Sequence, residues 1–316
     1  MSTATPPTVT PLVDTDVKSV LITTDFSPTS DKALGRALAI ARHYNANFYL
    51  AHVVSSIGYT IAGPPAALLA SEAAARDAQK LEQCLVANGS LAGLHHESII
   101  RQGEIFEQLQ DIIAQKSVDL VVAGTHARRT LGKFFLGSVA EQIFRGVQCP
   151  VLTVGPGSSP NSPLEKNRPF RSFLFATDFG EASLHALPRA ISFANHFGVK
   201  LILLHVAPVA PIPEGFHWSS TTGDVRQMQE NARVAALKKL EEIVSRNPPL
   251  NTKPEFLVKF GTPSRVILSV ASALGADLIL MGLNRVRHVE TACHLPWATA
   301  YEVVCNAVCP VLTVRN

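Results

Sequence analysis

An internal repeat restricts the fold of this chain more than any other feature of the sequence. Residues 19–53, SVLITTDFSPTSDKALGRALAIARHYNANFYLAHV, return as residues 172–206, SFLFATDFGEASLHALPRAISFANHFGVKLILLHV, with 15 of 35 positions identical. Unrelated segments of this length would share about two or three residues. Further along the repeat, Gly103 corresponds to Gly261, and the segment Cys149-Pro-Val-Leu-Thr-Val returns unchanged from Cys309. The chain is therefore a tandem duplication of one domain.

Each copy alternates short apolar segments with helical patterns. In the first copy the expected strands are 20–24, 48–54, 96–102, 119–124 and 149–154, and the expected helices follow Ser30, span 66–88 and 104–115, and follow Ser138. Strands and helices that alternate at this spacing predict right-handed crossovers and a parallel sheet. The expected fold class is α/β, with two tandem doubly wound domains. Each domain should hold a five-stranded parallel sheet with helices on both faces.

The residues outside the two copies predict the domain boundaries. Residues 1–17 are rich in Thr and Pro and contain no Lys or Arg, so we expect a disordered tail and not a secretory signal. Residues 156–169 have the Gly, Pro and Ser content of a linker. The first domain should therefore span 18–155, and the second should span 170–316.

Composition excludes several classes of function. The chain has 28 Lys and Arg against 25 Asp and Glu, without a dense basic block, so nucleic acid is not an expected partner. It lacks an apolar run of about 18 residues, so no membrane span is expected. The five cysteines form no C-x-x-C pair, and the His and Cys residues between 288 and 309 match no zinc motif. We expect a cytoplasmic protein with reduced thiols and no metal site.

Ligands of doubly wound sheets bind beyond the carboxyl ends of the strands, and two loops there carry candidate residues. Asp25 follows the first strand, where it can bond a ribose hydroxyl or, as we favour from this residue alone, cap the next helix. Gly124 ends the fourth strand, and Gly137-Ser138 opens the following helix, an arrangement typical of anion sites. Ser138 can cap that helix, donate to a phosphate, or do both. The basic residues between these glycines can attract an anion or be solvated loop charges; they are Arg128, Arg129 and Lys133.

Repeated histidines and missing motifs argue against catalysis. His43 and His196 recur at equivalent helical positions, and His52 and His205 recur at equivalent strand ends, which favours packing or backbone-bonding roles. The G-x-S-x-G nucleophile elbow is missing, and no paired carboxylates stand out. We therefore expect no catalytic residues.

These segments together resemble the universal stress protein family, across both copies. The family's nucleotide motif is G-x-x-G, nine residues, then G-[ST]. The first copy reads Gly124-Thr-His-Ala127, nine residues, then Gly137-Ser138, so the spacing holds and alanine replaces the second glycine. The segments TDFS at 24–27, LAHV at 50–53 and CPV at 149–151 also resemble the family.

The resemblance implies an ATP site in the first domain, with Mg²⁺ bridging the phosphates. In members that bind ATP, the matching Asp lies near the nucleoside, the backbone of the matching Val meets adenine, and the glycine loop holds the phosphates. The implied binding residues are Asp25, Val53, Gly124, Ala127, Gly137 and Ser138. Ala127 departs from the motif, because a left-handed conformation of alanine costs about 1 kcal/mol.

The second copy has lost part of this motif. It keeps Asp178, Val206 and Gly282, but Trp297 and Ala298 stand where the first copy has Gly137-Ser138. An indole in place of a phosphate-binding glycine should fill the site. We therefore expect the second site to be degenerate.

The implied function is that of a cytoplasmic stress-response protein, regulatory or protective, that binds ATP in its first domain and hydrolyses it slowly at most. The alternative is a nucleotide-free scaffold or protein-interaction module in which both sites have decayed. Family members commonly dimerise through their last strands, so the segments 151–154 and 311–314 should pair within the chain as a pseudo-dimer. A further homodimer and an unidentified protein partner remain open.

Overall fold

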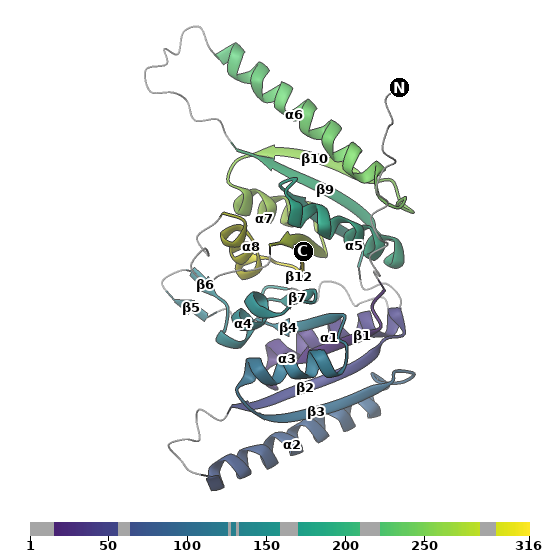
Figure 1. Cartoon of the computed structure of the whole chain (residues 1–316), viewed down its shortest axis with the longest axis vertical. Helices are drawn as coiled ribbons and strands as arrows, with labels where there is room; N and C mark the ends of the chain where they lie inside the picture. The colour runs from purple at the N-terminus through teal and green to yellow at the C-terminus, as the bar shows by residue number, and fades with distance from the viewer. Residues whose placement is uncertain are drawn as a thin grey trace, which may run out of the picture.

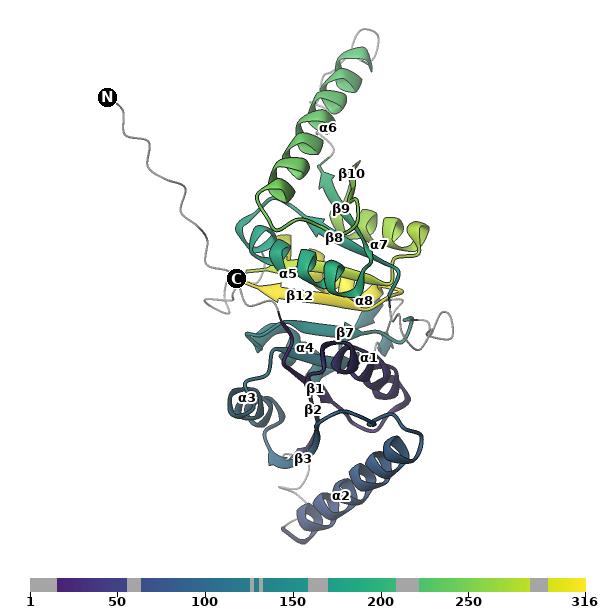
Figure 2. The ribbon, with the colours of Figure 1, turned by 90° about the vertical axis from the view of Figure 1, so that its right-hand side faces the viewer.

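The computed structural model describes residues 16–55, 64–125, 128–130, 133–158, 170–208, 222–284 and 295–316. Its centre is one ten-stranded sheet in the order β10-β9-β8-β11-β12-β7-β4-β1-β2-β3. Figure 1 shows the two domains stacked along the long axis, with the C-terminus near the middle of the molecule. The long helices α2 and α6 lie at the two poles (Figure 2).

The first domain contributes one half of the sheet. Its strands in that sheet are β1 (Ser19–Thr23), β2 (Asn47–Ser55), β3 (His96–Gly103), β4 (Leu120–Gly124) and β7 (Val151–Val154). Its helices are α1 (Pro28–Tyr44), α2 (Pro64–Ala87), α3 (Ile105–Gln115) and α4 (Ser138–Gly146). A small antiparallel ribbon of β5 (Arg128–Thr130) and β6 (Lys133–Phe135) follows β4, where the sequence predicts only a loop.

The second domain repeats this order without the small ribbon in its described part. Its strands are β8 (Ser172–Thr177), β9 (Lys200–Ala207), β10 (Glu255–Phe260), β11 (Leu278–Leu283) and β12 (Val311–Arg315). Its helices are α5 (Glu181–Phe197), α6 (Thr222–Ser245), α7 (Pro263–Leu274) and α8 (Leu295–Asn306). Within each half of the large sheet every strand pair is parallel, so the predicted pair of five-stranded parallel sheets is confirmed.

Helices cover both faces of the sheet, as predicted. On one face, apolar residues of α1, α2, α5 and α6 form a core with the strands that runs through both domains. On the other face, α3 and α4 cover the first domain, and α7 and α8 cover the second. The strand β4 is buried from Leu120 to Ala123, which explains its nearly all-apolar sequence.

The two domains join through their last strands. β7 and β12 pair antiparallel, with Leu152 opposite Leu312, and both leucines are buried. The Thr153 hydroxyl donates to the Val311 carbonyl at 3.1 Å. The prediction that the final strands pair within the chain is confirmed, and the central strands thereby cover each other's edges.

The boundaries of the first domain differ slightly from the predicted ones. Val17 is buried in the core, so the folded part begins before residue 18. Ser158 is also buried, and its N–H donates to the Gly155 carbonyl, so the first residues of the predicted linker belong to a turn after β7. The predicted tail 1–15 and the rest of the linker, 159–169, lie outside the described residues. Among the described helices, none has the length and apolar character needed to span a bilayer.

Candidate functional site

The strand order creates a switch point between β1 and β4. The chain runs from β1 to β2 and β3 on one side, then crosses back to place β4 on the other side of β1. Asp25 follows β1 and Gly124 ends β4, so the two residues lie at the carboxyl ends of neighbouring parallel strands. The crevice at such a point is where doubly wound sheets bind ligands.

The Asp25 carboxylate supports the start of α1. Its Oδ1 accepts hydrogen bonds from the Ser27 backbone N–H at 3.1 Å and from the Ser30 hydroxyl at 2.5 Å. Ser27 is the N-cap residue, and its hydroxyl accepts from the Ser30 N–H. Asp25 therefore has the helix-supporting role that its residue type favours, two positions before the cap itself.

Phe26 and His52 shape the loop around Asp25. Phe26 has φ of +59°, in the left-handed region, and its N–H donates to the Thr24 hydroxyl at 2.9 Å. Nδ1 of His52 donates to the Thr24 carbonyl at 2.7 Å, and the His52 and Phe26 rings lie 4.7 Å apart. The predicted backbone-bonding role of His52 is confirmed. Sequence analysis missed Phe26, although its recurrence as Phe179 is a signal for it.

Val53 and the glycine-serine pair occupy the flanks of the switch point. Val53 is half-buried on β2 and stands opposite Arg101 of β3. Gly137 is the N-cap of α4, with no side-chain cap, and Ser138 is the exposed first residue of that helix. Ser138 therefore does not occupy the capping position. Because a crossover helix starts at the carboxyl edge of its preceding strand, the α4 N-terminus faces the same edge as Gly124.

The loop between Gly124 and Gly137 is described in part. The departure from the family motif, Ala127, lies outside the described residues. The backbones of the three basic residues lie in the β5–β6 ribbon; they are Arg128, Arg129 and Lys133. Strand β6 contacts α8, so the ribbon of the first domain reaches the second domain.

Helix α4 is part of the domain junction. Leu136, Ala140 and Phe144 are buried in a core cluster whose other members belong to the second domain. The Phe144 and Tyr301 rings lie 6.4 Å apart, and the Arg315 guanidinium donates to the Phe144 carbonyl. A ligand bound at the start of α4 would therefore contact a helix that also packs against the second domain.

The equivalent region of the second domain has a different helix start. α8 begins at Leu295, so Trp297 lies inside its first turn, whereas Gly137 precedes α4. Asp178 Oδ1 accepts from the Gly180 N–H at 2.8 Å and from the Ser183 hydroxyl at 2.9 Å, as Asp25 does in its own loop. The residues at 285–294, which include the longer loop, lie outside the described part.

Gly282 is needed for packing. A Cβ atom at this position would lie 2.2 Å from the carbonyl oxygen of Ala182 at the start of α5. Gly282, the last residue but one of β11, therefore permits the close approach of α5, independently of any ligand.

Metal and thiol chemistry receive little support from the described residues. Within that part of the chain no group of three His, Cys, Asp or Glu side chains could hold a metal ion, and His288, Cys293 and His294 lie outside it. Burial raises the pKa of the Cys149 and Cys309 thiols to about 12, so both are protonated at neutral pH. Cys84 is exposed on α2.

Comparisons with known proteins agree with the tandem α/β fold. The universal stress protein family model matches the chain twice, over residues 16–155 and 169–315. A universal stress protein of Mycolicibacterium smegmatis is 28% identical over 303 residues, which cover 94% of this chain and 96% of that protein. The crystal structure of a universal stress protein from Archaeoglobus fulgidus has a TM-score of 0.65 and 20% identity, covering 95% of this chain and 98% of that one.

A universal stress protein in complex with cAMP also matches, at 20% identity and a TM-score of 0.31, over 46% of this chain and 96% of that one. The two family matches fall on the two halves of the ten-stranded sheet, and together they cover nearly all the described residues. The chain belongs to the universal stress protein family, as a member with two tandem copies of the family's domain.

Proposed function

We propose that this chain is a cytoplasmic stress-response protein that binds ATP in its first domain and acts by regulation. The proposed site consists of Asp25, Val53, Gly124, Ala127, Gly137 and Ser138. The observation that carries the proposal is the start of α4, which lies beside the switch point and has no side-chain cap. In the family's nucleotide motif the last two residues are a glycine and a serine or threonine, and here this pair, Gly137-Ser138, falls at the start of α4.

Gly137 fits a phosphate-binding role for a physical reason. Its φ of −62° and ψ of 153° suit any residue, so the backbone conformation alone does not require glycine there. Without a side chain at the N-cap, the first N–H groups of α4 stay accessible, and they carry the positive end of the helix dipole. The arrangement suits an anion, and Ser138 adds an exposed hydroxyl.

Asp25 suits the nucleoside of the proposed ligand. Asp25 is exposed just after β1, and in the proposed complex its carboxylate would accept a hydrogen bond from a ribose hydroxyl at the switch point. ATP would supply negative phosphates and, with Mg²⁺, the oxygen ligands that this cation prefers. We identify no base beside the loop in the described residues, so the proposed role is binding with slow hydrolysis at most.

Regulation is proposed because the site shares α4 with the domain junction. Phe144 and Ala140 of this helix are buried against the second domain. Nucleotide contacts at Gly137 and Ser138 would favour one arrangement of α4, which would change the surface formed with α8. A homodimer and a protein partner remain predictions. Light scattering tests the homodimer by measuring the mass of the protein in solution.

The alternative function, a nucleotide-free interaction module, is favoured by one observation. Asp178 makes the same two kinds of hydrogen bond as Asp25, in a domain that has lost the glycine-serine pair. The retention of this Asp in both domains is therefore explained by the support it gives to the following helix. Gly282 likewise has a packing explanation.

A pair of matched variants distinguishes these functions. Asp25→Asn and Asp178→Asn each weaken one helix start, so their effects on thermal stability should be similar. If the first domain binds ATP, Asp25→Asn weakens the affinity about tenfold, as expected for a lost charged hydrogen bond, and Asp178→Asn leaves it unchanged. Equal affinities in both variants would contradict the role of Asp25. Mass spectrometry of ligands released from the purified protein provides a second test, and an adenine nucleotide is the expected species.

A further inference from the structure

A pocket of about 700 Å³ lies at the junction of the two domains, and the proposed nucleotide site does not use it. Arg171, Asp277 and Pro310 line it from just before strands β8, β11 and β12. Because β7 runs antiparallel to β12, Gly157 closes the pocket from the first domain, together with Arg36 of α1. Its volume falls within the range of about 300–1,000 Å³ that small-molecule sites occupy.

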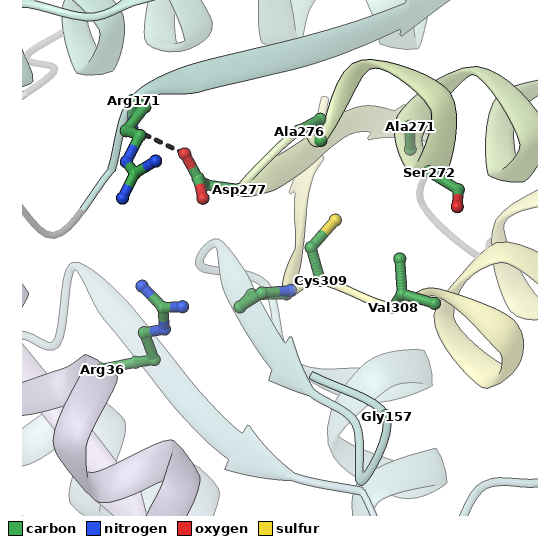
Figure 3. Close-up of a pocket in the computed structure, with 11 residues that line it drawn as sticks. Arg36, Gly157, Arg171, Ala271, Ser272, Ala276, Asp277, Val308 and Cys309 are labelled. Carbon is green, nitrogen blue, oxygen red and sulfur yellow. Dashed lines mark hydrogen bonds between the residues drawn. The ribbon is translucent and has the colours of Figure 1, made fainter. Parts of the chain in front are cut away.

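Two guanidinium groups face each other across this pocket. Figure 3 shows the Arg171 side chain reaching in from the second domain and the Arg36 side chain reaching in from the first, with the two guanidinium groups pointing toward one another. Among the described residues that line the pocket, Asp277 provides the one carboxylate. Its Oδ2 accepts the backbone N–H groups of Arg171 at 2.7 Å and of Ser172 at 3.2 Å. The described lining residues therefore carry one more positive than negative charge.

The Arg36 cation is held in a partly desolvated position. Burial lowers the pKa of Arg36 from its ordinary value, and the charge of Asp277 only offsets this in part. The guanidinium carbon of Arg36 lies 5.4 Å from the centre of the Phe170 ring. Because water screens a partly buried charge less than an exposed one, an anion in the pocket would interact strongly with this group.

The other described residues of the lining are neutral and largely apolar. The carbonyls at the end of α7 have partners, because Ala271 O accepts from the Ala276 N–H and Ser272 O accepts from the Gly275 N–H. Burial keeps the Cys309 thiol protonated, since its pKa rises to about 12. Val308 and Pro310 add further apolar surface to the lining. The pocket thus combines two guanidinium groups with a mainly apolar surface.

We propose that this pocket binds a small organic anion, with its carboxylate or phosphate group between Arg36 and Arg171 and a compact apolar body against the end of α7 and Val308. Guanidinium groups bind both kinds of oxyanion through paired hydrogen bonds. Such a ligand contacts both domains at once. The structure thereby assigns a second ligand site to the chain, on the opposite edge of the second domain's sheet from its switch point.

The repeat provides a matched control for this site. Lys18 is the counterpart of Arg171, and its backbone N–H donates to Asp119 Oδ2 at 2.9 Å, as that of Arg171 does to Asp277. Lys18 is absent from the pocket lining. Substitution of Arg171 and substitution of Lys18 each remove one exposed positive charge, from equivalent positions of the repeat. Of these two residues, Arg171 lines the pocket and Lys18 does not.

The test is a titration of the full ¹⁵N-labelled chain with three probes followed by NMR. Benzoate and phenyl phosphate carry the two acidic groups on one ring, and benzyl alcohol presents the same ring without charge. The amides of Gly157, Gly275 and Ala276 report the pocket. Those of Gly137 and Ser138 report the proposed phosphate site separately, so the two proposals can fail independently.

We expect saturable shifts of the pocket amides with benzoate, phenyl phosphate or both, and none with benzyl alcohol. Which acid binds identifies the headgroup. Arg171→Gln should weaken binding by about tenfold or more, and Lys18→Gln should leave it unchanged. No shift with either acid, an equal response to benzyl alcohol, or unchanged affinity in Arg171→Gln would overturn the proposal. Thermal unfolding of both variants confirms that they are folded.

Discussion

His43 and His196, which occupy equivalent positions of the two repeats, meet each other across the domain junction. Nε2 of His43 donates to the His196 carbonyl at 2.8 Å, and the two rings lie 4.8 Å apart at 80°. The Tyr44 ring stacks on that of His196, with centroids 3.9 Å apart. The C-terminal end of α1 thus packs against the C-terminal end of α5, its counterpart in the second repeat.

This contact predicts a pH dependence of stability. Partial desolvation, and then positive charge on His43, lower the pKa of His196 in the folded chain. The unfolded chain therefore binds this proton more readily, so the free energy of unfolding should fall as the pH drops through the ordinary histidine range, about 6.5. Urea unfolding at about pH 7.5 and about pH 5.5 measures the effect.

The His196→Phe variant retains a ring for stacking and removes the titrating group, so its loss of stability on acidification should be smaller than that of the wild type. His185, exposed on the same helix, provides the control variant His185→Gln. The interpretation is wrong if His196→Phe and the wild type lose the same free energy of unfolding over this pH range.

The pairing of β7 with β12 predicts a large cost for truncating Leu312. This side chain is fully buried opposite Leu152, at the centre of the ten-stranded sheet. Leu312→Ala should lower the free energy of unfolding by about 2–5 kcal/mol, because it removes buried methyl groups and leaves a cavity. Leu274, which is 42% exposed, provides the control, and Leu274→Ala should cost less than about 1 kcal/mol. Similar losses in the two variants would argue against a buried junction.

Two glycines predict opposite effects of adding a methyl group. Gly282→Ala would place a Cβ atom 2.2 Å from the Ala182 carbonyl oxygen, so it should destabilise the chain by about 3 kcal/mol. At Gly35, inside α1, an added Cβ would meet no heavy atom within 4 Å. Gly35→Ala should therefore stabilise the chain by about 0.5–1 kcal/mol. Thermal unfolding of the two variants measures the difference, and a stable Gly282→Ala variant would refute the close helix approach.

The repeat made most of the fold predictable. An alternating pattern written twice predicts two parallel sheets, and the family resemblance implies that the last strands of the two sheets pair. The β5–β6 ribbon was not predictable, because strands of three residues such as Arg128–Thr130 are too short to carry a periodic signal. The burial of Val17 was not predictable, because it is a lone apolar residue at the edge of a polar segment.

The candidate sites were predictable to different degrees. Asp25 follows β1 and Gly124 ends β4, so the topology alone places both residues at one edge of the sheet. The choice between a nucleoside and a helix cap at Asp25 depends on hydrogen bonds to Ser27 and Ser30 that only the structure provides. The interdomain pocket left no sequence signal, because Arg36 and Arg171 come together only through the antiparallel pairing of β7 with β12.

The most direct test of the central claim is a calorimetric titration of ATP with Mg²⁺ into the full chain. The wild type should bind one ATP per chain, and Gly137→Trp should bind none, because the indole would cover the first N–H groups of α4. Ala298→Trp adds an indole to the exposed equivalent edge of the second domain and should leave the stoichiometry and affinity unchanged. No heat of binding in the wild type, or equal binding by Gly137→Trp, would contradict the assignment of the nucleotide site to the first domain.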